Sequence, residues 1–199
     1  MAVTHTNRRG AMYHLLQGTT KTGKPKYFVS KKPGPNTVDV IPEGYELFES
    51  PIDAVVHVRK IRPTSILPEE LDETIRIIGK VTGKKIFYVL RESDALVVYW
   101  PDRDPEAVSK VFSRIFGASL HANSHDDTSF DPGVMMFMQT TAVLKFVLSN
   151  EKKRTFAAER MCFRGEGFWL PCSQSMPLPA LVEALCSDLG QESFYEIGL

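Results

Sequence analysis

The sequence predicts an α+β fold in which about three helices pack on a mainly antiparallel sheet, preceded by a small N-terminal β-meander. Short runs rich in β-branched and aromatic residues are separated by Pro/Gly turns over residues 11–62, as in an antiparallel β unit. Three later stretches repeat apolar residues at helical spacing. Beyond residue 62 the predicted order is α-β-β-α and then β-β-β-α-β, which is typical of helices packed on an antiparallel sheet.

The first 62 residues predict a basic, β-rich module. Its four expected strands are Met12–Gln17, Lys26–Ser30, Tyr45–Glu49 and Ala54–Ile61, with turns at Pro33–Pro35, Pro42–Gly44 and Ser50-Pro51. We place the domain boundary at its end, so that the α+β domain spans residues 63–199.

The stretch from Gly18 to Pro25 has the glycine and lysine spacing of a phosphate-binding P-loop. Pro25, however, stands where that loop needs a hydroxyl for Mg²⁺, and it has no amide hydrogen. The residues that follow are aromatic and β-branched rather than helical. We therefore predict a β-hairpin across this stretch and exclude a nucleotide-binding P-loop.

The second domain is expected to begin with a helix, a hairpin and a second helix. The first helix carries an apolar stripe from Leu67 to Val81, with acids in its first turns and Gly83 at its end. Strands are expected at 85–91 and 95–100. Asp104-Pro105 then starts a helix with apolar residues from Val108 to Phe116. Residues 118–133 are polar and predict a long loop.

The remaining residues predict three strands, a helix and a closing strand. The three strands are expected at 143–148, 155–163 and 168–172, with turns at 150–153 and 165–167. Apolar residues from Leu178 to Leu189 predict the third helix, which Gly190 ends. Ser193–Ile197 is expected to close the domain as a strand.

Composition limits the class of protein. The chain has 199 residues, of which 43% are hydrophobic and 24% charged, as in globular proteins with a packed core. It has neither an apolar run of about 20 residues nor the apolar core of a signal peptide. Its three cysteines do not suggest a disulfide framework. We therefore expect a cytoplasmic protein without a membrane span, and we predict no cofactor.

The charge distribution points to an anionic partner. Residues 1–62 hold 10 basic and 5 acidic side chains, and the first 38 residues contain no acid at all. Lysines interleaved with Tyr27 and Phe28 are typical of surfaces that bind phosphates and stack on bases. The predicted nucleic-acid-binding residues are Lys21, Lys24, Lys26, Tyr27, Lys31 and Lys32. Two alternatives stay open: lysines that only prevent edge-to-edge strand pairing, and an acidic protein partner.

Two other groups are candidate chemical sites. His121 and His125, with Asp126 or Asp127 as a third ligand, have the residue types of a zinc site, although their polar surroundings also fit a solvated loop. Cys162 lies between Arg160 and Arg164, whose charges would favour a thiolate. If that strand face is exposed, the thiol is a candidate nucleophile; if the face is buried, the thiol is inert. Paired carboxylates fall at helix starts and turns, where acids have structural roles.

A family of uncharacterised bacterial proteins with no assigned activity resembles this chain in four N-terminal segments, Ala2–Gly10, Tyr13–Gly18, Thr20–Pro25 and Pro42–Tyr45. Cys162–Gly165 and Leu189–Ser193 are similar to the same family, so the resemblance spans nearly the whole chain. It implies a bacterial, intracellular protein and no particular function. From the residues we expect a non-enzymatic binding protein that contacts nucleic acid through the basic hairpin. The alternatives are an enzyme with a site near the 118–133 loop and Cys162, and a structural subunit that binds a protein partner.

Overall fold

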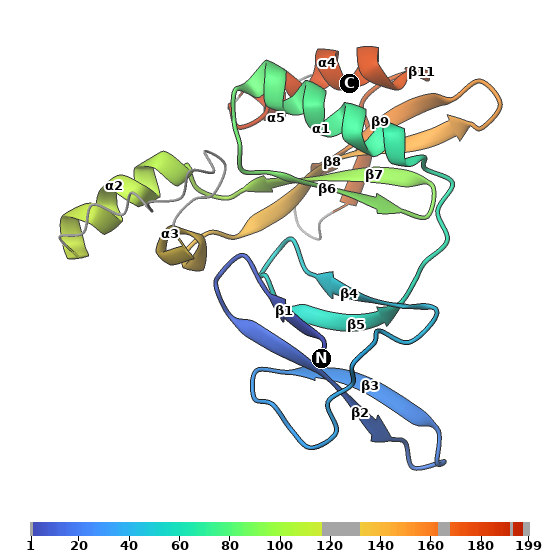
Figure 1. Ribbon diagram of the computed structural model, residues 1–199. Helices are drawn as coiled ribbons and strands as arrows, with labels where there is room; N and C mark the ends of the chain where they lie inside the picture. The colour runs from blue at the N-terminus through green and yellow to red at the C-terminus, as the bar shows by residue number, and fades with distance from the viewer. Residues whose placement is uncertain (1, 117–131, 163–167, 192, 197–199) are drawn as a thin grey trace. The chain divides into compact units, whose positions relative to one another are not determined.

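The computed structural model describes residues 2–116, 132–162, 168–191 and 193–196, and its α+β class confirms the prediction. The chain divides into two compact units (Figure 1). One contains Met1–Ile61 and Arg103–Gln139, and the other contains Arg62–Asp102 and Thr140–Leu199. The sequence predicts a single boundary at residue 62, whereas the structure adds residues 103–139 to the N-terminal unit.

The N-terminal unit is built on two small antiparallel sheets. The first has the strand order β1-β2-β3, and the second pairs β4 with β5. The bounds are Thr4–Thr6 for β1, Met12–Thr19 for β2, Pro25–Ser30 for β3, Tyr45–Glu49 for β4 and Val56–Lys60 for β5. Two helices complete the unit, namely α2 (Pro105–Phe116) and α3 (Pro132–Met136), and the rings of Phe112 and Phe137 meet between them at 5.7 Å.

The predicted hairpin at Gly18–Pro25 is confirmed. Strands β2 and β3 pair in register from His14 opposite Ser30 to Thr19 opposite Pro25. The tight turn is closed by the Thr20 amide, which donates to the Lys24 carbonyl at 2.8 Å, and by the Lys24 amide, which donates to the Thr20 hydroxyl at 3.0 Å. Gly23 takes a positive φ of 79°, which a residue without a side chain adopts at little cost. No helix follows Lys24, so the phosphate-binding geometry of a P-loop is absent from this described segment.

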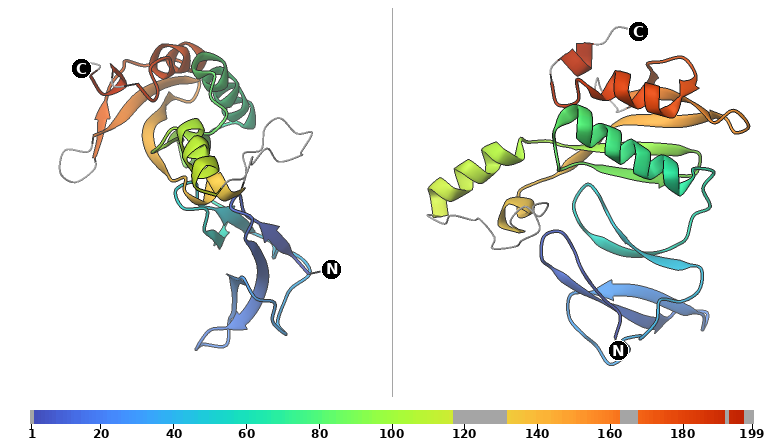
Figure 2. Two further views of the ribbon diagram at one scale, coloured as in Figure 1. Left: turned by 90° about the vertical axis from the view of Figure 1, so that its left-hand side faces the viewer. Right: turned by 45° about the horizontal axis from the view of Figure 1, so that its top comes forward.

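The C-terminal unit contains one six-stranded antiparallel sheet in the order β10-β9-β8-β7-β6, with β11 also paired to β9. Its strands are β6 (Tyr88–Glu92), β7 (Ala95–Pro101), β8 (Thr140–Asn150), β9 (Thr155–Cys162), β10 (Phe168–Pro171) and β11 (Met176–Pro177). Helices α1 (Pro68–Thr82) and α4 (Leu178–Cys186) pack together on one face of this sheet (Figure 2). The core lies in that layer, where Phe146, Phe156 and Ile78 are fully buried.

Helix α1 shows how local sequence sets its ends. Leu67 precedes the helix and has no polar side chain, but the Glu70 carboxylate accepts the Leu67 amide at 2.9 Å. At the other end Gly83 adopts the left-handed conformation, and its amide donates to the Gly79 carbonyl at 3.0 Å. Arg154, on the β8–β9 turn, donates from Nε to Glu70 at 2.9 Å, so this carboxylate also joins the helix to the sheet.

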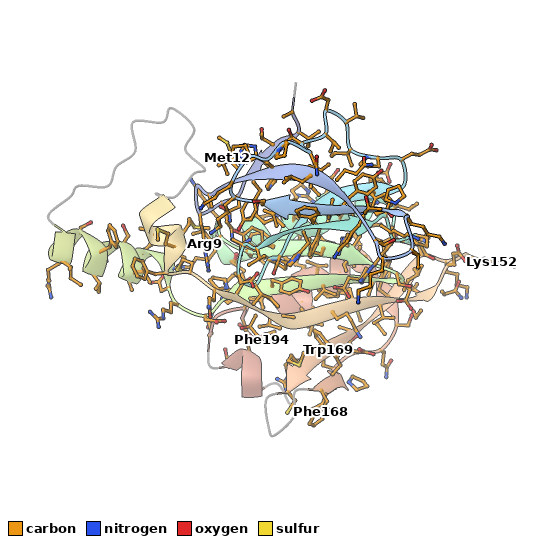
Figure 3. All side chains as sticks on the ribbon, turned by 90° about the horizontal axis from the view of Figure 1, so that it is seen from below. Arg9, Met12, Lys152, Phe168, Trp169 and Phe194 are labelled. Carbon is orange, nitrogen blue, oxygen red and sulfur yellow. The ribbon has the colours of Figure 1, made fainter. Side chains whose placement is uncertain are left out.

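The predicted closing strand is wrong. Ser193–Glu196 forms a short helix, α5, and Ile197 lies outside the described residues. The backbone is satisfied locally and by a side chain instead of a strand partner: the Phe194 amide donates to the Gln191 carbonyl, and Arg160 Nη1 donates to the Phe194 carbonyl. Phe194 is buried in the core (Figure 3), which explains why an aromatic sequence here does not require a strand.

Three further elements have no counterpart in the prediction. Strands β1 and β11 are too short to show alternation, and α3 begins at Pro132, within the expected loop at 118–133. Residues 117–131 of that loop lie outside the described residues. Among the described helices, none has the length and apolar character that crossing a bilayer requires.

Candidate nucleic-acid interface

The alternation of side chains along β3 separates the residues that sequence analysis grouped together. In a strand, successive side chains point to opposite faces. Lys26 and Phe28 therefore share one face with their cross-strand partners Gly18 and Leu16. Tyr27 lies on the other face. We call the surface formed by Gly18, Lys26 and Phe28 the hairpin face.

Phe28 is the exposed aromatic residue of the hairpin face. Its side chain is 42% exposed, a large value for a phenylalanine in the middle of a paired strand. A Cβ atom on Gly18 would stand 3.2 Å from Phe28 Cε1, so the ring extends toward Gly18 and uses the space that this glycine leaves. Neighbouring Leu16 is instead buried, with Gly34 packed against its Cδ2 atom. The Phe28 ring is thus exposed to solvent, whereas the neighbouring Leu16 side chain is covered.

Four lysines of the hairpin, Lys21, Lys24, Lys26 and Lys32, are exposed to solvent. Lys21 and Lys24 lie in the turn and Lys26 lies on β3, and all three are exposed. Lys32, just beyond the strand, is also exposed. Within the described ranges, none of these four lysines makes an ion pair. The first acid of the chain is Asp39, so the hairpin has no nearby acid in sequence to neutralise it.

Tyr27 and Lys31 belong to the opposite face of the sheet. The ring of Tyr27 is half-buried and meets the ring of Tyr45 edge-on, with centroids 5.3 Å apart. The ammonium group of Lys31 lies 5.7 Å from the ring centroid of Tyr13, where it makes a cation–π contact. The structure therefore places Lys26 on the same face as Phe28, with Lys21 and Lys24 in the adjoining turn, and it places Tyr27 and Lys31 on the other side.

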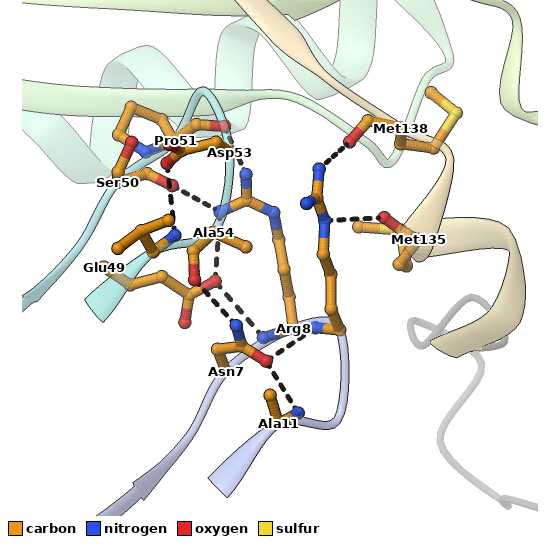
Figure 4. Close-up of polar contacts among 12 residues, drawn as sticks. Asn7, Arg8, Ala11, Glu49, Ser50, Pro51, Asp53, Ala54, Met135 and Met138 are labelled. Carbon is orange, nitrogen blue, oxygen red and sulfur yellow. Dashed lines mark hydrogen bonds and ion pairs between the residues drawn. The ribbon is translucent and has the colours of Figure 1, made fainter. Parts of the chain in front are cut away.

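Two basic residues of the same stretch have structural partners. Arg8 donates to the Glu49 carboxylate at 3.0 Å, to the Ser50 carbonyl at 2.8 Å and to the Pro51 carbonyl (Figure 4). Arg9 donates from Nε to the Met135 carbonyl at 3.2 Å and from Nη2 to the Met138 carbonyl at 2.9 Å. These guanidinium groups hold the N-terminal turn inside its unit and do not contribute to the hairpin face.

Asn7 anchors the same turn from within. Its side chain is buried and donates to the Ala54 carbonyl at 2.7 Å, while its own oxygen accepts the amides of Arg9 and Ala11. The Asn-Arg-Arg-Gly segment at residues 7–10 is thus a structural turn.

Cys162 lies at the end of β9, opposite Phe168 of β10, and is half-buried. Arg160, which shares its strand face, donates at 2.6 Å to the Phe194 carbonyl, so its guanidinium has a structural partner. Arg164 lies outside the described residues.

Burial raises the pKa of the Cys172 thiol, and it raises the pKa of the Cys186 thiol far above the usual range, so these two thiols are protonated at neutral pH.

The candidate zinc ligands His121, His125 and Asp126 all lie outside the described residues. In the parts of the chain that the structure describes, no three His, Cys, Asp or Glu side chains gather as a metal site would require.

Phe28 is the residue that the sequence prediction left out of the candidate site. Its position two residues from Lys26 along β3 is the signal that could have selected it over Tyr27, because residues two apart in a strand share a face.

Searches against protein-family models, curated proteins and solved structures found no match to this chain.

Proposed function

We propose that this protein is a non-enzymatic binding module that contacts nucleic acid through the tip and the hairpin face of β2–β3. The observation that carries the proposal is the combination of an exposed aromatic ring, Phe28, with three exposed lysines that have no ion-pair partner in the described structure. Exposed lysines attract phosphates without regard to sequence, and an aromatic ring adds a surface on which bases stack.

The expected strength follows from counterion release. If Lys21, Lys24 and Lys26 each neutralise one phosphate of a duplex, the slope of log K against log salt concentration is about −2.7. Raising the salt from 50 to 200 mM then weakens binding by about 40-fold. With Lys32 as a fourth contact, the slope approaches about −3.6. Contacts of this number support sequence-independent binding.

The test is fluorescence anisotropy with labelled single- and double-stranded oligonucleotides at several salt concentrations between 50 and 200 mM. The test variant changes Lys21, Lys24 and Lys26 to Gln. The control variant changes Lys80, Lys152 and Lys153 to Gln. These are three exposed lysines of the C-terminal unit, so the net charge changes equally.

Binding that loses most of its salt dependence in the hairpin variant, and keeps it in the control, supports the proposal. Equal losses in both variants would mean that net charge, and not the hairpin, drives the association. If the wild type binds neither oligonucleotide at 50 mM salt, the proposal is overturned, and an acidic protein becomes the better partner for these lysines.

A further inference from the structure

Phe28 differs from Tyr13 and Tyr27, the tyrosines of the same sheet, in its ring contacts. Tyr13 lies beneath the Lys31 ammonium group, and Tyr27 packs against Tyr45. In the described structure, no ring stacks on Phe28 and no cation lies over it. A phenylalanine that is 42% exposed keeps part of its apolar surface in contact with water, where a ligand can reach it.

The local backbone keeps this ring accessible. Because Gly18 has no Cβ, the ring can lie beside the β2 backbone without displacing a neighbouring side chain. Gly18 is directly opposite Lys26, so the ring lies beside the pair that contains this lysine. Lys26 precedes Phe28 by two residues on the same face, a distance of about 6.6 Å along the strand, since each residue advances about 3.3 Å. Lys24 and Lys21 continue the positive charge to the turn.

This arrangement distinguishes between the two forms of nucleic acid. A duplex presents phosphates to lysines, but its base faces are stacked inside the helix and cannot meet a ring on a sheet surface. A single strand presents both its phosphates and its base faces, and stacking on an aromatic side chain is the usual way in which sheets bind it. The lysines fit either form, whereas Phe28 fits only the single strand.

We propose that the ligand of the hairpin face is single-stranded nucleic acid, with an unpaired base stacked on Phe28 and adjacent phosphates paired with Lys26 and Lys24. This inference rests on the proposed function and narrows it to one class of nucleic acid. It requires no particular base, because every base has an aromatic face.

The experiment uses the full chain and an oligonucleotide of about ten nucleotides, within the site sizes that single-strand-binding modules cover. A 2-aminopurine base at its centre loses fluorescence when it stacks on an aromatic ring. Affinity is measured in parallel by anisotropy, with the matching duplex as the second ligand. The variants are Phe28→Leu, which stays apolar but cannot stack, and Phe28→Tyr, which can stack. Met12→Ala serves as the control, because Met12 (labelled in Figure 3) is 52% exposed and is not aromatic. By strand alternation, it lies on the same sheet face as Phe28.

We expect the wild type to prefer the single strand and to quench 2-aminopurine. Phe28→Leu should weaken single-strand binding by about 5- to 150-fold and abolish the quenching, with duplex binding unchanged. Phe28→Tyr should retain both signals, and Met12→Ala should match the wild type. A thermal midpoint for each variant shows that the fold is kept, which the exposure of both side chains leads us to expect.

The possible failures are distinct. Equal binding of single strand and duplex, with no effect of Phe28→Leu, would overturn the stacking inference and leave the proposed function standing. A loss of affinity without loss of quenching would also overturn it, since the stacked base would lie elsewhere. If the wild type binds neither ligand at 50 mM salt, both proposals fail together.

Discussion

The carboxylate of Glu49 joins three parts of the N-terminal unit, and its removal should weaken that unit measurably. Glu49 lies at the end of β4 and accepts hydrogen bonds from the Arg8 guanidinium at 3.0 Å and from the Arg8 amide at 3.2 Å (Figure 4). It also accepts a hydrogen bond from His5 Nε2 at 3.0 Å. The Arg8 side chain is 13% exposed and that of Glu49 is 19% exposed, so water replaces these contacts poorly. We predict that Glu49→Gln destabilises the unit.

The magnitude lies between two limits. Removing one partner of a fully buried ion pair costs about 3–5 kcal/mol, whereas exposed pairs contribute about 0–1 kcal/mol. Glu49 and Arg8 are mostly but not fully buried, and glutamine keeps one oxygen that accepts a hydrogen bond. Arg8 also retains the carbonyls of Ser50 and Pro51. We therefore expect a loss of about 2 kcal/mol. With a urea m-value of about 2 kcal/mol/M, the midpoint of unfolding should fall by about 1 M.

The assay must report on the correct unit. Both tryptophans, Trp100 and Trp169, belong to the C-terminal unit, so their fluorescence does not follow this change directly. Hydrogen exchange of peptides covering residues 4–16 and 45–60, measured over a urea series, does so. Glu73→Gln is the matched control, because Glu73 pairs with Arg76 on the exposed surface of α1. If both variants shift the midpoint equally, the hydrogen-bonded Glu49 network does not stabilise the unit as argued.

Two further predictions concern the C-terminal unit. Gly190 has a φ of 84°, and a Cβ there would stand 2.8 Å from Trp100 Nε1. Gly190→Ala should therefore lower the free energy of unfolding by at least about 1 kcal/mol and lower the thermal midpoint followed by tryptophan fluorescence. An unchanged midpoint would refute this packing. Burial raises the pKa of the Cys172 and Cys186 thiols, and the fully buried Cys186 should resist iodoacetamide at pH 8 until the chain unfolds. Since the folded state favours the neutral thiol, the contribution of these two thiols to stability is complete below the ordinary thiol pKa of 9.0 and declines as the pH rises above it. Rapid labelling of Cys186 in the native protein would contradict its burial.

Sequence periodicity predicted the secondary structure well where an element packs on one side. The hairpin at Gly18–Pro25 and the helix ending at Gly83 are both confirmed. The apolar stripe of α1 was predicted less accurately, because Ile75 is partly exposed while Thr74 is fully buried. The Thr74 hydroxyl donates to the Glu70 carbonyl at 2.7 Å, which satisfies its polar group and allows a threonine to face the core. A hydrophobicity pattern cannot anticipate such a local hydrogen bond.

Helix α2 shows the opposite limit. Its apolar stripe correctly predicts a helix, but in the described structure Val111 and Ile115 remain largely exposed. Periodicity indicates which residues share a helix face, but it does not indicate which segment will cover that face. The same limit applies to Ser193–Ile197, where aromatic composition suggested a strand, although the described residues Ser193–Glu196 form a helix.

The basic stretch at the N-terminus was predicted as one charge cluster, but the structure divides it by residue type. The partners of Arg9 are 126 and 129 positions away in sequence, and those of Arg8 are 41 to 43 positions away, so no local pattern could reveal them. Arg59, the other arginine of residues 1–61, is also engaged: it pairs with Glu46 at 2.8 Å and stacks over the Phe48 ring at 3.5 Å. The exposed hairpin lysines Lys21, Lys24, Lys26 and Lys32 have no such partners in the described structure.

This division follows from the chemistry of the two side chains. A guanidinium group has five donors in a rigid plane, so one arginine can bind several carbonyl and carboxylate oxygens at once, as Arg8 and Arg9 do. An ammonium group is more strongly hydrated and remains at the surface on a flexible chain. The positive charge that an incoming ligand meets at the hairpin is therefore carried by lysine alone. Because these lysines contribute nothing visible to the fold, replacing them tests binding without testing stability, and this makes the salt-dependence experiment a direct test of what the hairpin binds.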